Sequence, residues 1–378
     1  MIANKVIKMS IDTHKSLIRV FWIGIALIYI SVFIALYYKI ILPFSEWTIS
    51  DWLINYEDGG FKRRGLLGGF LFLIQDYIGM KLQVQILLLQ ILVLSGILFG
   101  MFLFTKKYKV DFFYLLIMIS PYILCFPALT IRSGGRREIL LILLVIGYSL
   151  AKKSRSNDVI LLLLYLIFLL VHELGFFYLP FLVWVNYLKW NKINFKYLLC
   201  LIVSTLLTVV LIYFLGSDIN NGESLSILKE RGVVFNKENI FELEYFFDFN
   251  FVLKHKISFL IHIAELFIII FQMGYYIYLF KRTFFNTYII GNVICVLWVA
   301  PLFYLGIDWF RWVYIYSSLL FVIFSCSCLE INDLKGIQFN KNIMIKPIYL
   351  IVSVFFYLFI FLHLQHDTLF ILIKKILT

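Results

Sequence analysis

Two stretches of the sequence place a pair of glycines and several arginines directly before an apolar segment. One covers residues 131–138 (IRSGGRRE) and the other covers residues 59–67 (GGFKRRGLL). Glycine allows a backbone to approach a ligand closely, and the start of a helix presents unbonded N–H groups. Arginine adds a full charge and a planar fork of donors that suits phosphate oxygens. We therefore expect an anion site, and a diphosphate on a lipid carrier would need two such clamps.

The arginines that we expect to hold this diphosphate lie in short loops beside apolar runs. They are Arg63, Arg64, Arg132, Arg136, Arg137 and Arg311. Arg311 belongs to the stretch 308–312 (DWFRW), where an Asp–Arg pair is either a helix cap and membrane anchor or a third arm of the anion site. The alternative for each of the other arginines is a snorkelling anchor or nonspecific contact with lipid headgroups.

His172 and Glu173 form the sharpest isolated pair of ionisable residues, because they end a short apolar run. Ionisable groups in such a place are costly unless they are paired or used. A neutral histidine accepts a proton near pH 7 and a neighbouring carboxylate can orient it, so we expect His172 to act as a general base with Glu173 as its substitute. The alternative is a buried histidine that is hydrogen-bonded to a carbonyl group.

The segment 43–64 carries further carboxylates among aromatic residues, and Asp58 is our candidate catalytic acid there. The segment also has the pattern of an amphipathic helix that lies on the headgroups with its acids, Asp51 among them, in water. His262 and Glu265 share one helix face, and we expect them to form a structural pair. The sequence holds no Asp-x-Asp pair and no histidine one turn from His172, so we predict neither a metal nor a cofactor.

Composition shows which elements must position these residues. Of the 378 residues 62% are apolar and only 15% are charged, whereas a soluble domain has about 45–50% apolar and about 25% charged residues. The five cysteines lie in or beside apolar runs, which argues against disulfide and zinc frameworks. The sequence therefore predicts a single all-α, polytopic membrane domain over residues 1–378.

Apolar runs set the expected number of membrane crossings. The long runs lie near 18–42, 82–104, 110–130, 196–215, 257–280, 284–306, 312–329 and 347–364, and the short ones near 65–80, 138–151, 158–171 and 174–188. We expect about eleven transmembrane helices, with residues 65–80 forming a re-entrant half-helix. The longest connection, residues 216–256, is the expected large periplasmic loop, and its aromatic and acidic residues suit either sugar binding or contact with the membrane.

The basic residues support this arrangement, because short cytoplasmic loops are enriched in lysine and arginine. With a cytoplasmic N-terminus, 18 of the 34 basic residues fall on the cytoplasmic side. They are Lys5, Lys8, Lys15, Arg19, Lys106, Lys107, Lys109, Lys152, Lys153, Arg155, Lys189, Lys192, Lys196, Lys281, Arg282, Lys335, Lys341 and Lys346. The arginine stretches and His172 then face the periplasm. The net charge of +12 is thus explained by topology, without binding to nucleic acid.

This layout and the two glycine–arginine stretches resemble the O-antigen and capsular polysaccharide polymerases of the bacterial inner membrane. The resemblance implies a metal-independent GT-C-type glycosyltransferase, active on the periplasmic face. Its substrates would be undecaprenyl-diphosphate-linked glycans, both as donor and as acceptor, and its partners would be membrane lipids and a chain-length regulator protein. No arginine spacing of that family can be aligned with this sequence.

Two other function classes stay open. A GT-C transferase with a polyprenyl-monophosphate sugar donor would also place an acid in the first outer loop, where Asp51 and Asp58 lie. A lipid-linked oligosaccharide flippase or other transporter would place charged residues along a central path and often has repeated halves. The sequence shows no such halves.

Overall fold

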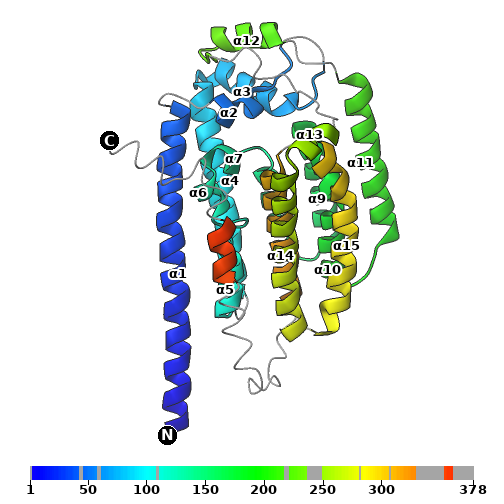
Figure 1. The fold of residues 1–378 in the computed structure, drawn as a ribbon. Helices are drawn as coiled ribbons and strands as arrows, with labels where there is room; N and C mark the ends of the chain where they lie inside the picture. Colours follow the sequence, from blue (N-terminus) through cyan, green and yellow to red (C-terminus); the bar gives the residue numbers. More distant parts are fainter. Residues whose placement is uncertain are drawn as a thin grey trace.

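The computed structural model describes residues 2–41, 46–57, 61–107, 110–216, 221–235, 249–280, 282–305, 308–328 and 353–360. Within these ranges every regular element is a helix and no β-strand occurs, which confirms the all-α prediction. Figure 1 shows long helices side by side, with shorter helical pieces gathered at the end of the bundle opposite the N-terminus. The candidate catalytic residue Asp58 lies outside the described residues.

Six helices are long and apolar enough to cross a membrane, which supports a multi-pass membrane protein. They are α1 (Ile2–Ile41, apolar from Lys15), α4 (Leu82–Lys107), α11 (Phe195–Leu215), α14 (Lys256–Phe280), α15 (Arg282–Leu305) and α16 (Trp309–Cys328). Helices α1 and α11 are the least buried of these, as expected for helices that face lipid. Helix length alone does not account for the expected count of about eleven crossings.

Helix α16 forms the centre of the bundle, because 89% of its apolar window is buried. It packs against α14, α8 (Ile139–Leu150) and α10 (Leu179–Trp190). Its small serines allow close packing, and two of them bond inside the protein. The Ser325 hydroxyl donates to the Phe321 carbonyl at 2.7 Å and lies 2.7 Å from the Tyr114 hydroxyl, and the Ser327 hydroxyl donates to the Ile323 carbonyl at 2.7 Å. The contact with Tyr114 joins the last turns of α16 to a distant part of the chain.

The short helices beside α16 are separated by sharp breaks. Helix α9 (Arg155–Val171) ends because His172 has an extended backbone, and a 3₁₀ turn, η2 (Glu173–Tyr178), leads into α10. Gly175 permits this turn, since a Cβ atom there would lie 2.8 Å from the Phe168 ring. Pro180 then occupies the first turn of α10, where a missing N–H costs nothing. The break places His172 and Glu173 at the end of the bundle.

The remaining short pieces are α5 (Phe112–Met118), α6 (Phe126–Leu129) and α7 (Ile131–Gly134). They form an irregular path that leads from the far end of α4 back toward the start of α8. Residues 353–360 are also helical and lie beside α5 in Figure 1. In this helix the Tyr357 hydroxyl donates to the Leu116 carbonyl at 2.9 Å.

The segment 43–64 is not the amphipathic surface helix that its pattern suggested. Its described part forms two short turns, α2 (Glu46–Ile49) and η1 (Ser50–Leu53), in which Trp52 and Leu53 are fully buried. Helix α3 (Gly65–Ile78) lies so close that a Cβ atom on Gly68 would be 2.0 Å from the Ile54 carbonyl oxygen. This close packing covers the segment, and the Asp51 side chain keeps only 18% of its exposure.

Helix α3 has the length expected of a half-helix, since its 14 residues span about 21 Å against roughly 30 Å of hydrocarbon. Figure 1 shows it at the same end of the bundle as α2 and α12 (Asn221–Glu230). Just after α12, the Arg231 guanidinium pairs with Glu57 and with Asp76 of α3, and it stacks on the Phe72 ring. The long connection after α11 is thereby attached to α3. Its second helix is α13 (Phe249–Lys254), and residues 236–248 lie outside the described residues.

Candidate functional site

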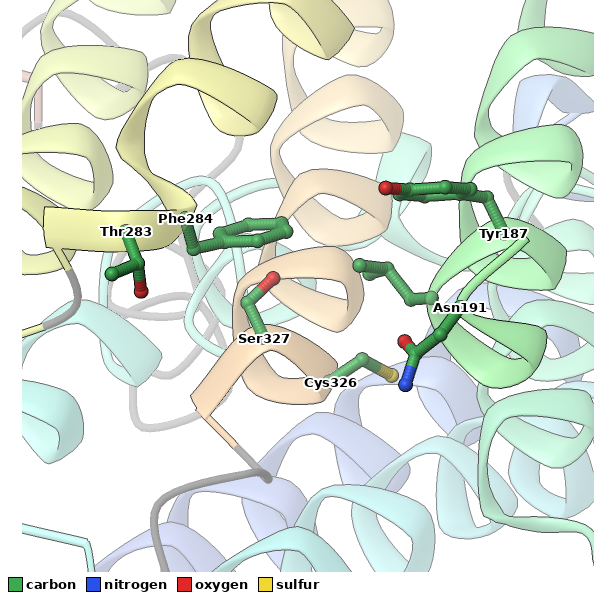
Figure 2. A pocket seen from close by; sticks show the side chains of 7 residues that line it. Tyr187, Asn191, Thr283, Phe284, Cys326 and Ser327 are labelled. Atoms are coloured by element: carbon green, nitrogen blue, oxygen red, sulfur yellow. The ribbon is translucent and has the colours of Figure 1, made fainter. Parts of the chain in front are cut away.

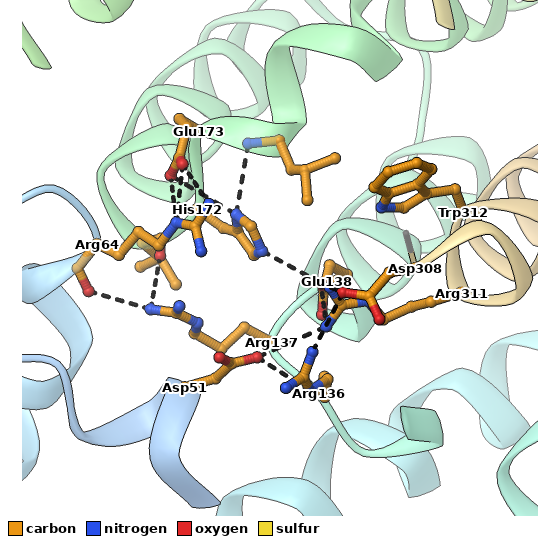
Figure 3. Close-up of polar contacts among 12 residues, drawn as sticks. Asp51, Arg64, Arg136, Arg137, Glu138, His172, Glu173, Asp308, Arg311 and Trp312 are labelled. Atoms are coloured by element: carbon orange, nitrogen blue, oxygen red, sulfur yellow. Dashed lines mark hydrogen bonds and ion pairs between the residues drawn. The ribbon is translucent and has the colours of Figure 1, made fainter. Parts of the chain in front are cut away.

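Charged side chains from five parts of the chain meet where α3, α8 and α16 begin and α9 ends (Figure 3). We call this group the charged cluster. It consists of Asp51, Arg63, Arg64, Arg136, Arg137, Glu138, His172, Glu173, Asp308 and Arg311. Both glycine–arginine stretches, the His172–Glu173 pair and Arg311 thus come together, although they are far apart in the sequence.

Arg64 connects the start of α3 to the end of α9. Its guanidinium donates to both carboxylate oxygens of Glu173 at 2.5–2.8 Å, and the Arg63 guanidinium lies 3.6 Å from the same carboxylate. Arg64 has a left-handed backbone with φ of 71°, a conformation that costs a non-glycine residue on the order of 1 kcal/mol or more. This turn leaves the Arg64 carbonyl free to accept a hydrogen bond from Arg137 at 3.1 Å.

Arg136 and Arg311 share two carboxylates. Arg136 lies 3.1 Å from Asp51 and 3.8 Å from Asp308, and Arg311 lies 3.7 Å from Asp51 and 2.5 Å from Asp308. Arg311 also lies 3.2 Å from Glu138. The Asp–Arg pair at the start of α16 is therefore part of the charged cluster, and Asp308 is its most exposed carboxylate, with 38% of the side chain exposed.

His172 is enclosed by protein, with only 1% of the residue exposed. The Leu174 N–H donates to the His172 Nδ1 atom at 3.4 Å, and Nε2 forms a 3.1 Å hydrogen bond with Glu138 Oε1. Glu173 lies 3.7 Å from Nδ1. Both ring nitrogens are therefore occupied. The bond to Glu138 fits a positioning role for His172, and its role as general base stays a prediction.

The glycines of the stretch 131–138 have a packing role in this structure. A Cβ atom on Gly134 would lie 2.4 Å from the Pro127 Cα atom, and one on Gly135 would lie 3.0 Å from Gln90. The first N–H groups of α8 bond to carbonyls of Arg136, Arg137 and Glu138. The close approach that we expected toward a ligand is thus made toward protein, and the arginine side chains remain the candidates for binding an anion.

Arg137 is the most buried member of the charged cluster, at 0% exposure. One terminal nitrogen donates to the carbonyls of Arg64 and Val171, each at 3.1 Å. Its Nε and its other terminal nitrogen have no hydrogen-bond partner among the described residues. Unsatisfied donors of a buried cation are costly, which makes them candidates for an anionic ligand. The cluster brings five guanidinium groups together with four carboxylates, so the arginines outnumber the acids.

The pKa shifts in the charged cluster separate its carboxylates into two classes. Burial opposes ionisation, but Arg136 and Arg137 hold the pKa of Asp51 below its ordinary value, and Arg64 with His172 holds the pKa of Glu173 well below. Desolvation raises the pKa of Asp308, and Arg136 compensates only in part. Burial also lowers the pKa of Arg137 to about 10. Among the four carboxylates of the charged cluster, Asp308 alone has a pKa above its ordinary value.

Sequence reasoning located most of these residues and missed two roles. Glu138 stood in the quoted stretch without an assigned function, yet it joins His172 to Arg311. Asp308 was considered only as a partner of Arg311. Arg132 lies in α7, partly buried, where its charge opposes the rise in the Asp308 pKa. His262 pairs with Glu265 at 2.9 Å and lies outside the charged cluster, as expected of a structural pair. In the described part of the chain, no group of three or more His, Cys, Asp or Glu residues is placed to hold a metal ion.

A cavity of about 280 Å³ lies at the opposite end of the bundle (Figure 2). Its lining residues include Tyr187, Asn191, Thr283 and Cys326, and none of the residues that line it is charged. It is therefore a poor candidate for an anion site. Comparisons of this chain with protein-family models, with curated proteins and with solved structures find no match.

Proposed function

We propose that this protein is a membrane glycosyltransferase that joins lipid-diphosphate-linked oligosaccharide units into O-antigen or capsule polysaccharide. The observation that carries the proposal is the charged cluster, in which five arginines converge and the buried Arg137 keeps two nitrogens without partners. A diphosphate offers several anionic oxygens to such donors, and arginine binds them in pairs. Donors that are fixed in advance stabilise the charge that develops on a leaving diphosphate.

The reaction would proceed by displacement at the anomeric carbon of the donor. The bond from this carbon to the diphosphate oxygen breaks, and the lipid diphosphate leaves with the electron pair. The acceptor hydroxyl forms the new glycosidic bond and transfers its proton to Asp308, the most exposed carboxylate and the one with a raised pKa. His172 and Glu138 would act behind it as positioning residues for Arg311.

We propose that the chain crosses the bacterial inner membrane about eleven times, with a cytoplasmic N-terminus and the charged cluster on the periplasmic side. Helices α8, α9 and α10, the irregular path through α5 to α7 and the helical residues 353–360 would complete the crossings. The positions of the basic residues support this topology. Lys106, Lys153 and Lys189 all lie at helix ends remote from the charged cluster, as expected if those ends face the cytoplasm. Short helices can still cross the membrane where the bilayer is locally thin or where neighbouring helices surround their ends.

One observation favours a second candidate, a GT-C transferase with a polyprenyl-monophosphate donor. Asp51 lies in the first outer segment and contacts both Arg136 and Arg311 within the charged cluster. Under this alternative Asp51 would be the indispensable acid, and a monophosphate donor would support transfer. Under our proposal the diphosphate donor is required, and Asp51 positions the two arginines.

The cellular test is the length distribution of lipid-linked glycans in cells that lack the protein. Our proposal expects single repeat units to accumulate and polymer to disappear, with both effects reversed by the wild-type gene. Normal polymer in the deletion strain would contradict the proposal. Loss of one sugar from each repeat unit, with polymerisation intact, would instead support the monophosphate transferase.

A further inference from the structure

Two apolar grooves flank α9, and each leads toward one of the two arginine stretches. The first lies between α8 and α9 and has a volume of about 500 Å³. The second lies between α9 and α11 and has a volume of about 480 Å³. Both are lined almost entirely by aliphatic and aromatic side chains. Helix α9, which separates them, ends at His172 and Glu173 within the charged cluster.

The groove between α8 and α9 begins at Leu140 and Val171. Leu140 follows Arg137 and Glu138 by a few residues, and the Val171 carbonyl accepts a hydrogen bond from Arg137. The groove continues to Ala151 at the other end of α8. Eleven residues of helix correspond to about 16 Å, roughly half of the hydrocarbon thickness of a bilayer. A chain in this groove would place its head at Arg136 and Arg137.

The groove between α9 and α11 begins at Phe61, Leu170 and Leu215. Phe61 directly precedes Lys62, Arg63 and Arg64 in the first arginine stretch. The other wall reaches the same stretch, because a Cβ atom on Gly216 would lie 3.7 Å from the Arg63 Cβ atom. A chain in this second groove would place its head at Arg63.

We propose that these grooves hold the isoprenoid chains of two lipid diphosphates, the donor between α8 and α9 and the acceptor between α9 and α11. This inference rests on the proposed function. The donor is assigned to the first groove because Arg137, which bonds to the Val171 carbonyl at that groove's end, keeps two nitrogens without a partner among the described residues. The guanidinium of Arg64, in the stretch beside the second groove, already engages both oxygens of Glu173. The two diphosphates would then lie on either side of the end of α9, near enough for their glycans to meet.

An apolar lining alone does not make a groove in a membrane protein selective for an isoprenoid chain, because all lipid tails are as apolar as leucine. Phospholipid acyl chains are therefore the competing occupants, and specificity must come from the diphosphate at the arginines. The test must separate a positioned isoprenoid chain from bulk lipid, and it must not depend only on activity.

The first arm of the test measures binding by photolabelling. The probe is a polyprenyl diphosphate that carries a diazirine near its head, added to the purified protein in phosphatidylglycerol nanodiscs. We expect labelled residues in α8, α9 and α11 along the grooves, with at least a tenfold loss of label on addition of unlabelled polyprenyl diphosphate. Labelling that is spread equally over α1, or that resists this competitor, identifies bulk lipid and overturns the inference.

The second arm fills each groove with a side chain. Gly147 lines the first groove, and a Cβ atom there meets nothing within 4 Å, so Gly147→Trp directs an indole ring into the groove without a backbone clash at Cβ. Thr208 lines the second groove, so Thr208→Trp adds bulk there. Gly24→Trp is the matched control, since Gly24 is an exposed α1 glycine with equally open surroundings. We expect at least a tenfold lower polymerisation rate for both groove variants and a change of less than twofold for the control.

Substrates with shortened lipid tails test which groove holds the donor and which holds the acceptor. Shortening only the donor tail to two isoprene units should rescue Gly147→Trp, and shortening only the acceptor tail should rescue Thr208→Trp. The reverse pattern overturns the assignment of donor and acceptor. If the wild-type protein is active and the Gly147→Trp and Thr208→Trp variants polymerise as fast, the grooves do not hold the isoprenoid chains. The proposed function would still stand. Competed labelling of the grooves in a protein that never polymerises would contradict the proposed function alone.

Discussion

Arg136 is the residue that best shows how the charged cluster holds itself together. It lies between Asp51 and Asp308, and its own side chain is only 12% exposed. A charge in such a place is tolerated because it is paired, and removal of one partner leaves the others uncompensated. A substitution in the charged cluster therefore affects both ligand binding and the positions of neighbouring side chains.

We predict that Arg136→Ala abolishes polymerisation and that Arg136→Lys loses most of it. Lysine keeps the charge but loses the fork of donors that contacts phosphate oxygens in pairs. The measurement is glycan chain length in a complemented deletion strain, normalised to protein abundance. Arg155→Ala serves as the control, because Arg155 stacks on Trp190 at the far end of α9. Normal chain lengths in Arg136→Ala cells with normal protein levels would refute this role.

Asp308 gives a prediction about pH. Desolvation raises its pKa above the ordinary value of about 4, and a general base works only when it is deprotonated. The rate should therefore fall as the pH is lowered through this raised pKa. Asp308→Asn should lose the acidic limb of the pH–rate profile together with about 10²- to 10⁴-fold of the rate.

The control for Asp308 is Asp76→Asn, which changes an exposed carboxylate that pairs with Arg231 outside the charged cluster. It should keep the wild-type pH profile. An unchanged acidic limb in Asp308→Asn would show that another group accepts the proton, and in that case His172→Ala and Glu173→Ala become the informative variants.

Much of the charged cluster could be predicted from the sequence, because the expected topology leaves these basic residues on the non-cytoplasmic side, where the positive-inside rule does not account for them. Arg64, Arg136 and Arg311 were found in this way. The pairing of His172 with Glu138 could not be predicted, since it depends on how η2 folds back on α9 at Gly175. For Asp51 the sequence left open both a catalytic role and a place in water, because it does not reveal that α3 packs against η1.

At the scale of elements, hydropathy predicted the long helices and left the short ones undecided. Helices such as α8, with 12 residues, are shorter than the usual span, so length does not show whether they cross. Their positions depend instead on close contacts between segments distant in sequence. Gly134 against Pro127 and Gly68 against Ile54 are two such contacts, and a single sequence does not identify these partners.

We predict that Gly68→Ala destabilises the protein by about 1–3 kcal/mol, because the new methyl group overlaps a backbone carbonyl that cannot move aside. Gly24→Ala should instead be neutral or stabilising by up to about 1 kcal/mol, since its Cβ meets open space. Thermal unfolding in one detergent measures both variants. Equal midpoints for the two would argue against the tight packing of α3 over Ile54.

At the scale of the whole molecule, the charged cluster occupies one end of the bundle and the basic loops occupy the other. We predict that an impermeant maleimide added outside labels Ser226→Cys in α12 but labels Lys153→Cys only after the membrane is permeabilised. Each cysteine is introduced into a background without native cysteines. Labelling of both positions from the same side would refute the proposed topology, and with it the periplasmic location of the site.

Polymerisation by the purified protein tests the central claim most directly. Wild-type protein in nanodiscs receives one synthetic polyprenyl-diphosphate-linked repeat unit as both donor and acceptor, and products are resolved by length. Our account predicts a ladder of repeat units and release of polyprenyl diphosphate, with one diphosphate freed for each bond formed, and neither product with Arg136→Ala. Absence of a ladder from folded wild-type protein, or a ladder of equal yield from Arg136→Ala, would contradict it.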